Sequence, residues 1–229
     1  MSNAVPEEAS SADLLTEHLG PDGLTPSESQ RQTRERLVFF SDAVVAIAMT
    51  LLALELPVPH GDTSGEVWRS FVDLLPRDYL TFTISFAVTA AFWHTHHRLF
   101  QRVDRADAVL SRLNIVCLLF IVLLPFASRV LGEDGSLAFG VIFYASVIIA
   151  VDLSYLAMVV YTIRHRLVRT DVAPATLRTS VIRITTVAAV FLVSIPIALI
   201  NPDAGKYTWL VLIVLPSLRS SLRRRAKAT

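Results

Sequence analysis

A single apolar stretch limits what this 229-residue chain can fold into. From Leu37 to Leu56 the sequence holds one charged side chain, Asp42, before Glu55 near the far end. That length and polarity match a helix that crosses the hydrocarbon core of a bilayer, which takes about 20 predominantly apolar residues. A carboxylate inside such a helix is costly, so Asp42 is a candidate functional or assembly residue.

Composition places the whole chain among membrane proteins. Hydrophobic residues make up 53% of the sequence and the mean hydropathy is +0.52, which is too apolar for an ordinary soluble domain. The first thirty residues lack the basic start and apolar core of a secretory signal. The single cysteine, Cys117, excludes a disulfide within the chain and lies in an apolar run, which is typical of packing.

Later apolar segments predict five more helical spans. Pro57 and Pro59 end the first span, and apolar residues at helical spacing within 65–76 predict a short amphipathic helix at the membrane interface. The six spans are expected at about residues 37–56, 78–100, 113–131, 137–165, 179–200 and 207–218. Pro125 predicts a kink in the third span, and the sixth is the weakest because it is shorter than a usual span.

Three regions follow from this pattern. Residues 1–30 are rich in Ser, Glu, Pro and Gly with few large apolar side chains, so we predict a disordered cytoplasmic tail. Residues 31–220 are expected to form a six-helix transmembrane domain, and residues 221–229 a basic cytoplasmic tail. The predicted fold class is therefore an all-α membrane protein with six transmembrane helices per chain.

The basic residues give the expected orientation. If the N-terminus is cytoplasmic, all but four of the 21 Lys and Arg residues lie on the cytoplasmic side of the six spans. The exceptions are Arg69, Arg77, Arg129 and Lys206. The positive-inside rule therefore favours a multi-pass protein of the plasma membrane with both termini in the cytoplasm. The outer side holds an excess of acids, which either concentrate cations at an outer mouth or simply belong to solvated loops.

The first span has one specialised face. At about 100° per residue, four side chains fall on a narrow stripe with Leu51 beside it. The four are Ala43, Ile47, Thr50 and Leu54. Taken alone, such a stripe is most simply an ordinary helix contact.

An ordered motif stands at the start of the same helix. Arg36, Phe40, Ser41 and Asp42 form an Arg-x-x-x-Phe-Ser-Asp array, followed by AIAMTLLALEL. This array and its position resemble the first helix of the bacterial members of the transmembrane-protein-175 family of potassium channels. The likeness extends to six spans over residues 36–220, since the bacterial form has one six-helix unit per chain.

The resemblance implies a homotetramer in which the first helices of four subunits line a central pore. In the family, large apolar side chains at i, i+4 and i+7 form the constriction, and these positions match Ile47, Leu51 and Leu54. Thr50 is the one hydroxyl on the stripe and is a candidate for coordinating an ion or for packing.

The resemblance also implies a polar network that ties the first helix to its neighbours. Its members are Arg36, Phe40, Ser41 and Asp42. The sequence Trp93-His94-Thr95-His96-His97 ends the second span at the same membrane depth as Asp42. We therefore expect Asp42 to accept hydrogen bonds from Ser41 and from the imidazole of His96 or His97. Proton sensing by these histidines is a second interpretation.

Other chemistry is not supported. The HxHH spacing differs from the HxxxH and HxxHH boxes of membrane di-iron enzymes, and six histidines are too few for them. No metal, cofactor or catalytic residue is predicted, and the chain is not expected to be an enzyme. The basic run after the last span fits anionic lipid better than nucleic acid.

The resemblance implies a potassium-permeable cation channel whose partners are potassium ions and the lipid bilayer. The sequence contains no TVGYG filter, so the apolar constriction would have to discriminate between ions. One alternative is a proton- or ion-coupled secondary transporter that uses Asp152, although no inverted repeat is evident. A non-conducting membrane scaffold is another. An interhelical hydrogen bond from Asp152 to a Ser, a Tyr or Asn114 is the simpler expectation for that residue.

Overall fold

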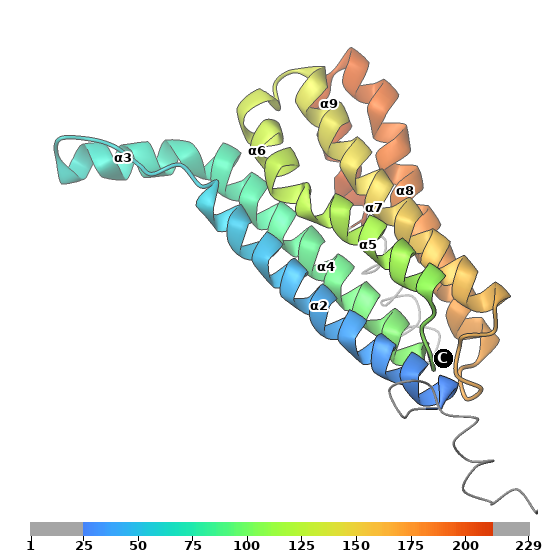
Figure 1. Cartoon of the computed structure of the whole chain (residues 1–229). Coiled ribbons are helices and arrows are strands. Elements are labelled where there is room, and N and C mark those ends of the chain that lie inside the picture. The colour runs from blue at the N-terminus through green and yellow to red at the C-terminus, as the bar shows by residue number, and fades with distance from the viewer. Residues whose placement is uncertain (1–24, 213–229) are drawn as a thin grey trace, which may run out of the picture.

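The computed structural model describes residues 25–212, and they form a bundle of helices (Figure 1). The elements are α2 (Pro26–Leu54), α3 (Ser64–Leu74), the π-helix η1 (Leu75–Tyr79), α4 (Leu80–Arg102), α5 (Ala108–Val122), α6 (Leu124–Asp134), α7 (Ala138–Arg164), α8 (Pro174–Ile200), α9 (Pro202–Tyr207) and the 3-10 helix η2 (Thr208–Leu210). Helices α2 and α4 lie side by side along one edge of the bundle, and α7 packs between α5, α6 and α8.

Helix α2 begins about three turns before the predicted span. Thr25 and Glu28 form a capping box, in which the Thr25 hydroxyl accepts from the Glu28 N–H while the Glu28 carboxylate accepts from the Thr25 N–H. This satisfies backbone donors that the first helical turn leaves unpaired. The predicted disordered tail is therefore wrong for residues 25–30, and its other residues, 1–24, lie outside the described part of the chain. The predicted basic tail at 221–229 lies outside it as well.

The predicted amphipathic helix is α3, and it projects sideways from the bundle (Figure 1). None of its residues is buried. It continues through η1 directly into α4, so Pro76 interrupts the helix only by widening one turn. This π-helical turn accommodates a proline that cannot donate the usual backbone hydrogen bond.

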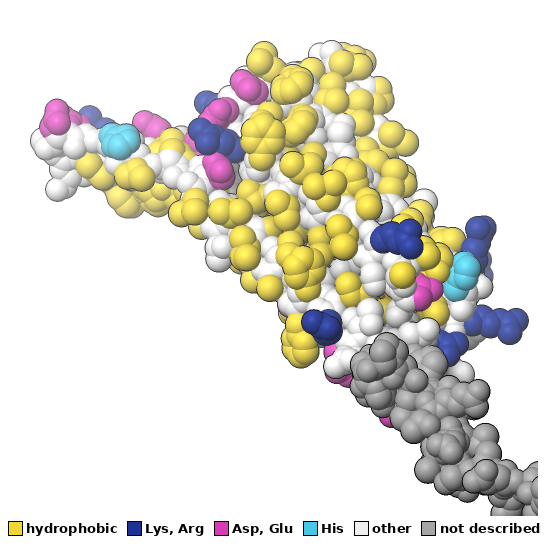
Figure 2. Space-filling model, viewed as in Figure 1, with side chains coloured by type: hydrophobic (Ala, Val, Ile, Leu, Met, Phe, Trp, Pro, Cys, Tyr) yellow, Lys and Arg dark blue, Asp and Glu magenta, His cyan; other side chains and the backbone are white. Residues whose placement is uncertain are grey.

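Four helical segments are long and apolar enough to cross a membrane: Glu28–Leu54, Ala108–Asp134, Ala138–Arg164 and Ala175–Ile200. The second of these contains both α5 and α6, which meet at Leu123 just before Pro125, as the predicted kink requires. Helix α4 is also long enough to cross a membrane, but its hydroxyl side chains and its histidines lower its hydropathy. Of the predicted sixth span, residues 207–212 lie in α9, η2 and the two helical residues that follow, and residues 213–218 lie outside the described chain. Figure 2 shows a broad band of hydrophobic side chains between the charged ends.

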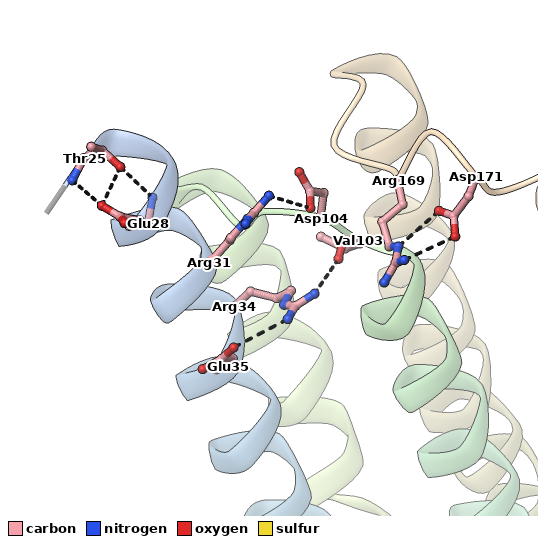
Figure 3. Close-up of polar contacts among 9 residues, drawn as sticks. All are labelled: Thr25, Glu28, Arg31, Arg34, Glu35, Val103, Asp104, Arg169 and Asp171. Carbon is pink, nitrogen blue, oxygen red and sulfur yellow. Dashed lines mark hydrogen bonds and ion pairs between the residues drawn. The ribbon is translucent and has the colours of Figure 1, made fainter.

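One end of the bundle, which we call the basic end, joins the start of α2 to the connections 103–107 and 165–173. Val103 pairs with Val168 in an isolated antiparallel bridge. Arg34 donates to the Val103 carbonyl at 3.0 Å, and Arg31 forms an ion pair with Asp104 at 3.7 Å (Figure 3). These contacts hold the ends of α2, α4, α7 and α8 together.

Asp107 caps α5 at the basic end. Its carboxylate accepts from the Leu110 N–H at 2.8 Å and from the Tyr161 hydroxyl at 2.7 Å. Partial burial acts to raise the pKa of Asp107, but these hydrogen bonds outweigh it and hold the pKa below its usual range. Their stabilising effect is present above the ordinary pKa of an aspartate and is lost as the pH falls through the lowered value.

The opposite end, which we call the acidic end, joins α2 and η1 to α6. Arg77 donates to the carbonyl groups of Gly132 and Glu133. Arg129 forms ion pairs with Glu133 at 2.9 Å and with Glu55 at 3.3 Å. The helices therefore run alternately between the two ends, as the predicted spans require, for the five crossings that residues 25–200 contain.

Candidate functional site

One face of α2 packs against the rest of the chain. Ser41, Val45, Ala48 and Leu52 are each only 1% exposed, and they recur at intervals of three or four residues. This spacing keeps them on one side of the helix, where they meet α4, α5 and α6.

The opposite face of α2 carries the predicted stripe, and it is uncovered. Ile47 is 59% exposed, Leu51 38% and Leu54 79%. Thr50 is also exposed, and its hydroxyl donates to the Ile47 carbonyl at 2.8 Å, which leaves the oxygen free to accept. We call Ile47, Thr50, Leu51 and Leu54 the α2 stripe. A row of large apolar side chains facing away from the chain's own core marks an interaction surface, a lipid contact or a pore lining.

A buried polar cluster joins α2 to two neighbouring helices. Asn114 of α5 donates through its amide nitrogen to the Ser41 hydroxyl at 3.0 Å, and its carbonyl oxygen lies 2.7 Å from Nε2 of His96 on α4. All three side chains are at most 2% exposed. Because an amide oxygen only accepts, Nε2 of His96 carries the donated proton. Sequence reasoning placed Ser41 and His96 in a network but did not identify Asn114 as its centre.

Asp42 has a different partner from the one predicted. Its carboxylate accepts from the Trp93 indole N–H at 2.8 Å, while Ser41 and His96 both turn to Asn114. The prediction that Asp42 accepts from Ser41 and an imidazole is therefore wrong. At about 100° per residue Ser41 points into the bundle and Asp42 toward its flank, where α4 presents Trp93.

The other motif residues lie outside the buried cluster. The His97 ring stacks on Trp93 with the ring centroids 5.6 Å apart, and its buried Nδ1 has no hydrogen-bond partner among residues 25–212. Arg36 is exposed, and Phe40 is 53% exposed, both on the uncovered side of α2. Within one chain, Ser41 therefore packs inward and Asp42 lies on the flank of α2, whereas Arg36 and Phe40 face outward.

Asp152 lacks the hydrogen bond expected for it. The side chain is 3% exposed in the middle of α7, and its Oδ2 is unpaired within the described residues. Asn114 is occupied by Ser41 and His96, and the hydroxyl of Ser154 donates to the Ala150 carbonyl. The structure also gathers no group of three or more His, Cys, Asp or Glu able to hold a metal ion anywhere in residues 25–212.

We predict that Asp42 and Trp93 stabilise the protein as a pair. In a double-mutant cycle of Asp42→Ala and Trp93→Phe, the coupling free energy should be about 1 kcal/mol, because a partly exposed carboxylate accepts from a neutral donor. Phe retains a ring that can stack on His97 and removes only the N–H. The free energies would be measured from the unfolding of the purified protein in detergent, and strictly additive effects of the two substitutions would contradict the pairing.

The fold and the α2 stripe define the class as an all-α, multi-pass membrane protein. Comparison with known proteins then shows which family the chain resembles. Residues 36–125 match the family model described as "Endosomal/lysosomal potassium channel TMEM175". The matched segment begins at Arg36, includes the whole α2 stripe and extends to the start of α6.

Several relatives support this match. The chain is 33% identical to a potassium channel of Streptomyces collinus over 127 residues, which are 54% of this chain and 61% of the relative. It is 41% identical to a potassium channel of Chamaesiphon minutus over 101 residues, or 43% and 49% of the two chains. With the human endosomal/lysosomal proton channel TMEM175 it shares 30% identity over 132 residues, or 57% and 26%. The aligned regions thus span about half to three fifths of these bacterial relatives.

A solved structure extends the likeness to most of the fold. The crystal structure of a lysosomal potassium-selective channel TMEM175 homolog from Chamaesiphon minutus superposes with a TM-score of 0.68 at 26% identity, covering 82% of this chain and 98% of that one. Over residues 36–125 the chain is similar to the TMEM175 family, as its first helix predicts, and the bacterial relatives above are named potassium channels.

Proposed function

We propose that this protein is a potassium-permeable cation channel in which the α2 stripes of several copies line the pore. The observation that carries the proposal is the exposure of Ile47, Leu51 and Leu54, which face away from the packed face of α2. Two bacterial relatives are named potassium channels, which supports the same assignment.

A single stripe cannot enclose a path, so the proposal includes an oligomer. Closed cyclic symmetry is the usual way in which identical chains surround an axis, and we propose a homotetramer. Each stripe residue then forms a ring. Rings of Ile47, Leu51 and Leu54 would act as an apolar constriction that gates by excluding water, while the Thr50 oxygen could offer a ligand to a passing ion.

Electrostatics at the acidic end favour cations. Eight acids belong to this end: Glu55, Asp62, Glu66, Asp73, Asp78, Glu133, Asp134 and Asp203. Only Arg69, Arg77, Arg129 and Lys206 oppose them. Three of the acids are neutralised in ion pairs with Arg129 or Lys206, and the remaining excess of negative charge would raise the local concentration of potassium ions.

The orientation in the plasma membrane can be tested with single cysteines. We predict that Asp62→Cys, at the acidic end, reacts with an impermeant thiol reagent in intact cells, whereas Asp171→Cys, at the basic end, reacts only after permeabilisation. The native Cys117 is 1% exposed and should give little background. Cysteines near residues 20 and 226, outside the described chain, should behave like Asp171→Cys if both termini are cytoplasmic. Labelling of Asp171→Cys from outside intact cells would reverse the proposed topology.

Potassium flux into liposomes that contain the purified protein tests the function itself. A channel conducts down the potassium gradient without a second ion, and we expect this result. The buried, unpaired Oδ2 of Asp152 favours one other candidate, a coupled transporter, whose flux would require a proton or sodium gradient. Liposomes that stay impermeable to potassium under both conditions would point to a non-conducting scaffold.

A further inference from the structure

A cavity of about 330 Å³ opens at the basic end, on the side of the bundle away from the α2 stripe. Its lining residues come from α4, α7 and α8: Thr95, Arg98, Arg102, Tyr155, Ala175, Thr176, Thr179, Ser180 and Arg183. Three of them are arginines and none is acidic. Nothing in the proposed pore uses this cavity.

The arginines retain most of their hydrogen-bonding capacity. Arg102 donates to the Ser180 hydroxyl at 2.9 Å, and Arg183 donates to the Thr95 hydroxyl at 2.7 Å. Arg98 has no hydrogen bond or ion pair with any residue of the described chain. A guanidinium carries five N–H donors, so each of the three can still bind an oxyanion. Asp152 interacts electrostatically with Arg183 from α7, but it does not line the cavity.

The first turns of α8 supply the rest of the lining. Thr176, Thr179 and Ser180 place hydroxyl groups beside the arginines, and the positive end of the helix dipole points to the same side. Since α8 has 27 residues, this dipole is fully developed. The protons of the Thr179 and Ser180 hydroxyls are donated to carbonyls within α8, so the arginine forks carry the recognition. Paired N–H groups of this kind bind phosphate oxygens.

We propose that this cavity binds a phosphate group, either the headgroup of an anionic lipid or a soluble phosphate. The two arginine hydrogen bonds already join α4 to α8 here, and a phosphate held by Arg98 of α4 and Arg183 of α8 adds a further link between these helices. Because Trp93 of α4 donates to Asp42 of α2, binding would stabilise the helix that supports the α2 stripe. The site does not depend on ion conduction.

The test follows thermal unfolding of the full chain in detergent during titration with three additives. These are dioleoyl phosphatidic acid, inorganic phosphate and, as a zwitterionic control, dioleoyl phosphatidylcholine. Arg98→Gln removes the arginine without breaking any bond within the described chain. Arg105→Gln is the matched control, since Arg105 is an exposed arginine at the same end that does not line the cavity. Arg98→Lys keeps the positive charge but loses the planar arrangement of N–H donors of the guanidinium.

We expect saturable stabilisation of the wild type and Arg105→Gln by phosphatidic acid, by phosphate or by both, with little effect of phosphatidylcholine. Affinity should fall about tenfold in Arg98→Gln and less in Arg98→Lys, as loss of one charge-assisted contact implies. Stabilisation by phosphatidic acid alone identifies a lipid headgroup, and stabilisation by inorganic phosphate identifies a soluble source. If Arg98→Gln does not fold, Arg98→Lys must show weaker binding than Arg105→Gln. No saturable stabilisation, or equal affinity in the Arg98 and Arg105 variants, overturns the proposal.

Discussion

Ile47→Asn should raise cation flux by about tenfold or more and reduce the discrimination between potassium and sodium. An ion that crosses a ring of isoleucines gives up part of its hydration without receiving a ligand. Asparagine is similar in size and offers an oxygen, so the barrier falls, and a barrier lowered by about 1.4 kcal/mol corresponds to a tenfold rate. The measurement is potassium and sodium flux into liposomes that contain equal amounts of folded protein.

Val45→Asn provides the matched control on the same helix. Val45 is 1% exposed on the packed face, so an amide there is buried without a designed partner and should lower stability while leaving the pore lining intact. An Ile47→Asn protein with unchanged flux and selectivity would place the constriction elsewhere, with Leu51 and Leu54 the next candidates.

Asn114→Ala should destabilise the protein more than any other single substitution that we consider. It removes a hydrogen-bond partner of both Ser41 and His96, which are almost fully buried. His96 loses its partner, which costs about 1–3 kcal/mol, whereas the Ser41 hydroxyl keeps its bond to the Leu37 carbonyl and loses only the bond from Asn114. We therefore expect a loss of about 2–4 kcal/mol in the free energy of unfolding. The loss would be measured by unfolding of the purified protein in detergent.

Ile115→Ala is the control for Asn114→Ala. The neighbouring Ile115 is 57% exposed on the outer side of α5, so its truncation leaves the polar cluster intact and should have a small effect. Comparable losses for the two variants would show that the cluster does not hold α2 to α4 and α5.

Much of the fold could be predicted because membrane spans obey strong local rules. Twenty apolar residues, prolines at their ends and the distribution of arginines located the end of α2 and both ends of α4, α5–α6, α7 and α8 within about five residues. The start of α2 was missed because its first turns are polar and are stabilised by the Thr25 capping box, which composition does not reveal. Helix α3 was recognised from its amphipathic spacing, but not its continuation through η1 into α4.

The sequence predicted which residues share the exposed side of α2, but it did not predict which polar side chains form hydrogen bonds with one another. Helical periodicity alone placed Ile47, Thr50 and Leu54 on one side, and the structure leaves that side uncovered. Partner choice depends on the rotation of three helices about their axes, which sequence does not specify. With the observed rotation, Asp42 forms a hydrogen bond with Trp93, whereas Ser41 and His96 form hydrogen bonds with Asn114. Asn114 is itself a polar residue within an apolar run, and this was the one signal in the sequence that pointed to it.

Silver ions or a water-soluble thiol reagent applied to Ile47→Cys would test the central claim that the α2 stripe lines the ion path. Leu192→Cys is the control, because Leu192 is 60% exposed on α8, far from the stripe in the sequence and on a different helix. We predict that the reagent blocks potassium flux through Ile47→Cys and leaves flux through Leu192→Cys unchanged. Unaltered flux through Ile47→Cys after complete modification of its thiol would contradict a pore lined by α2.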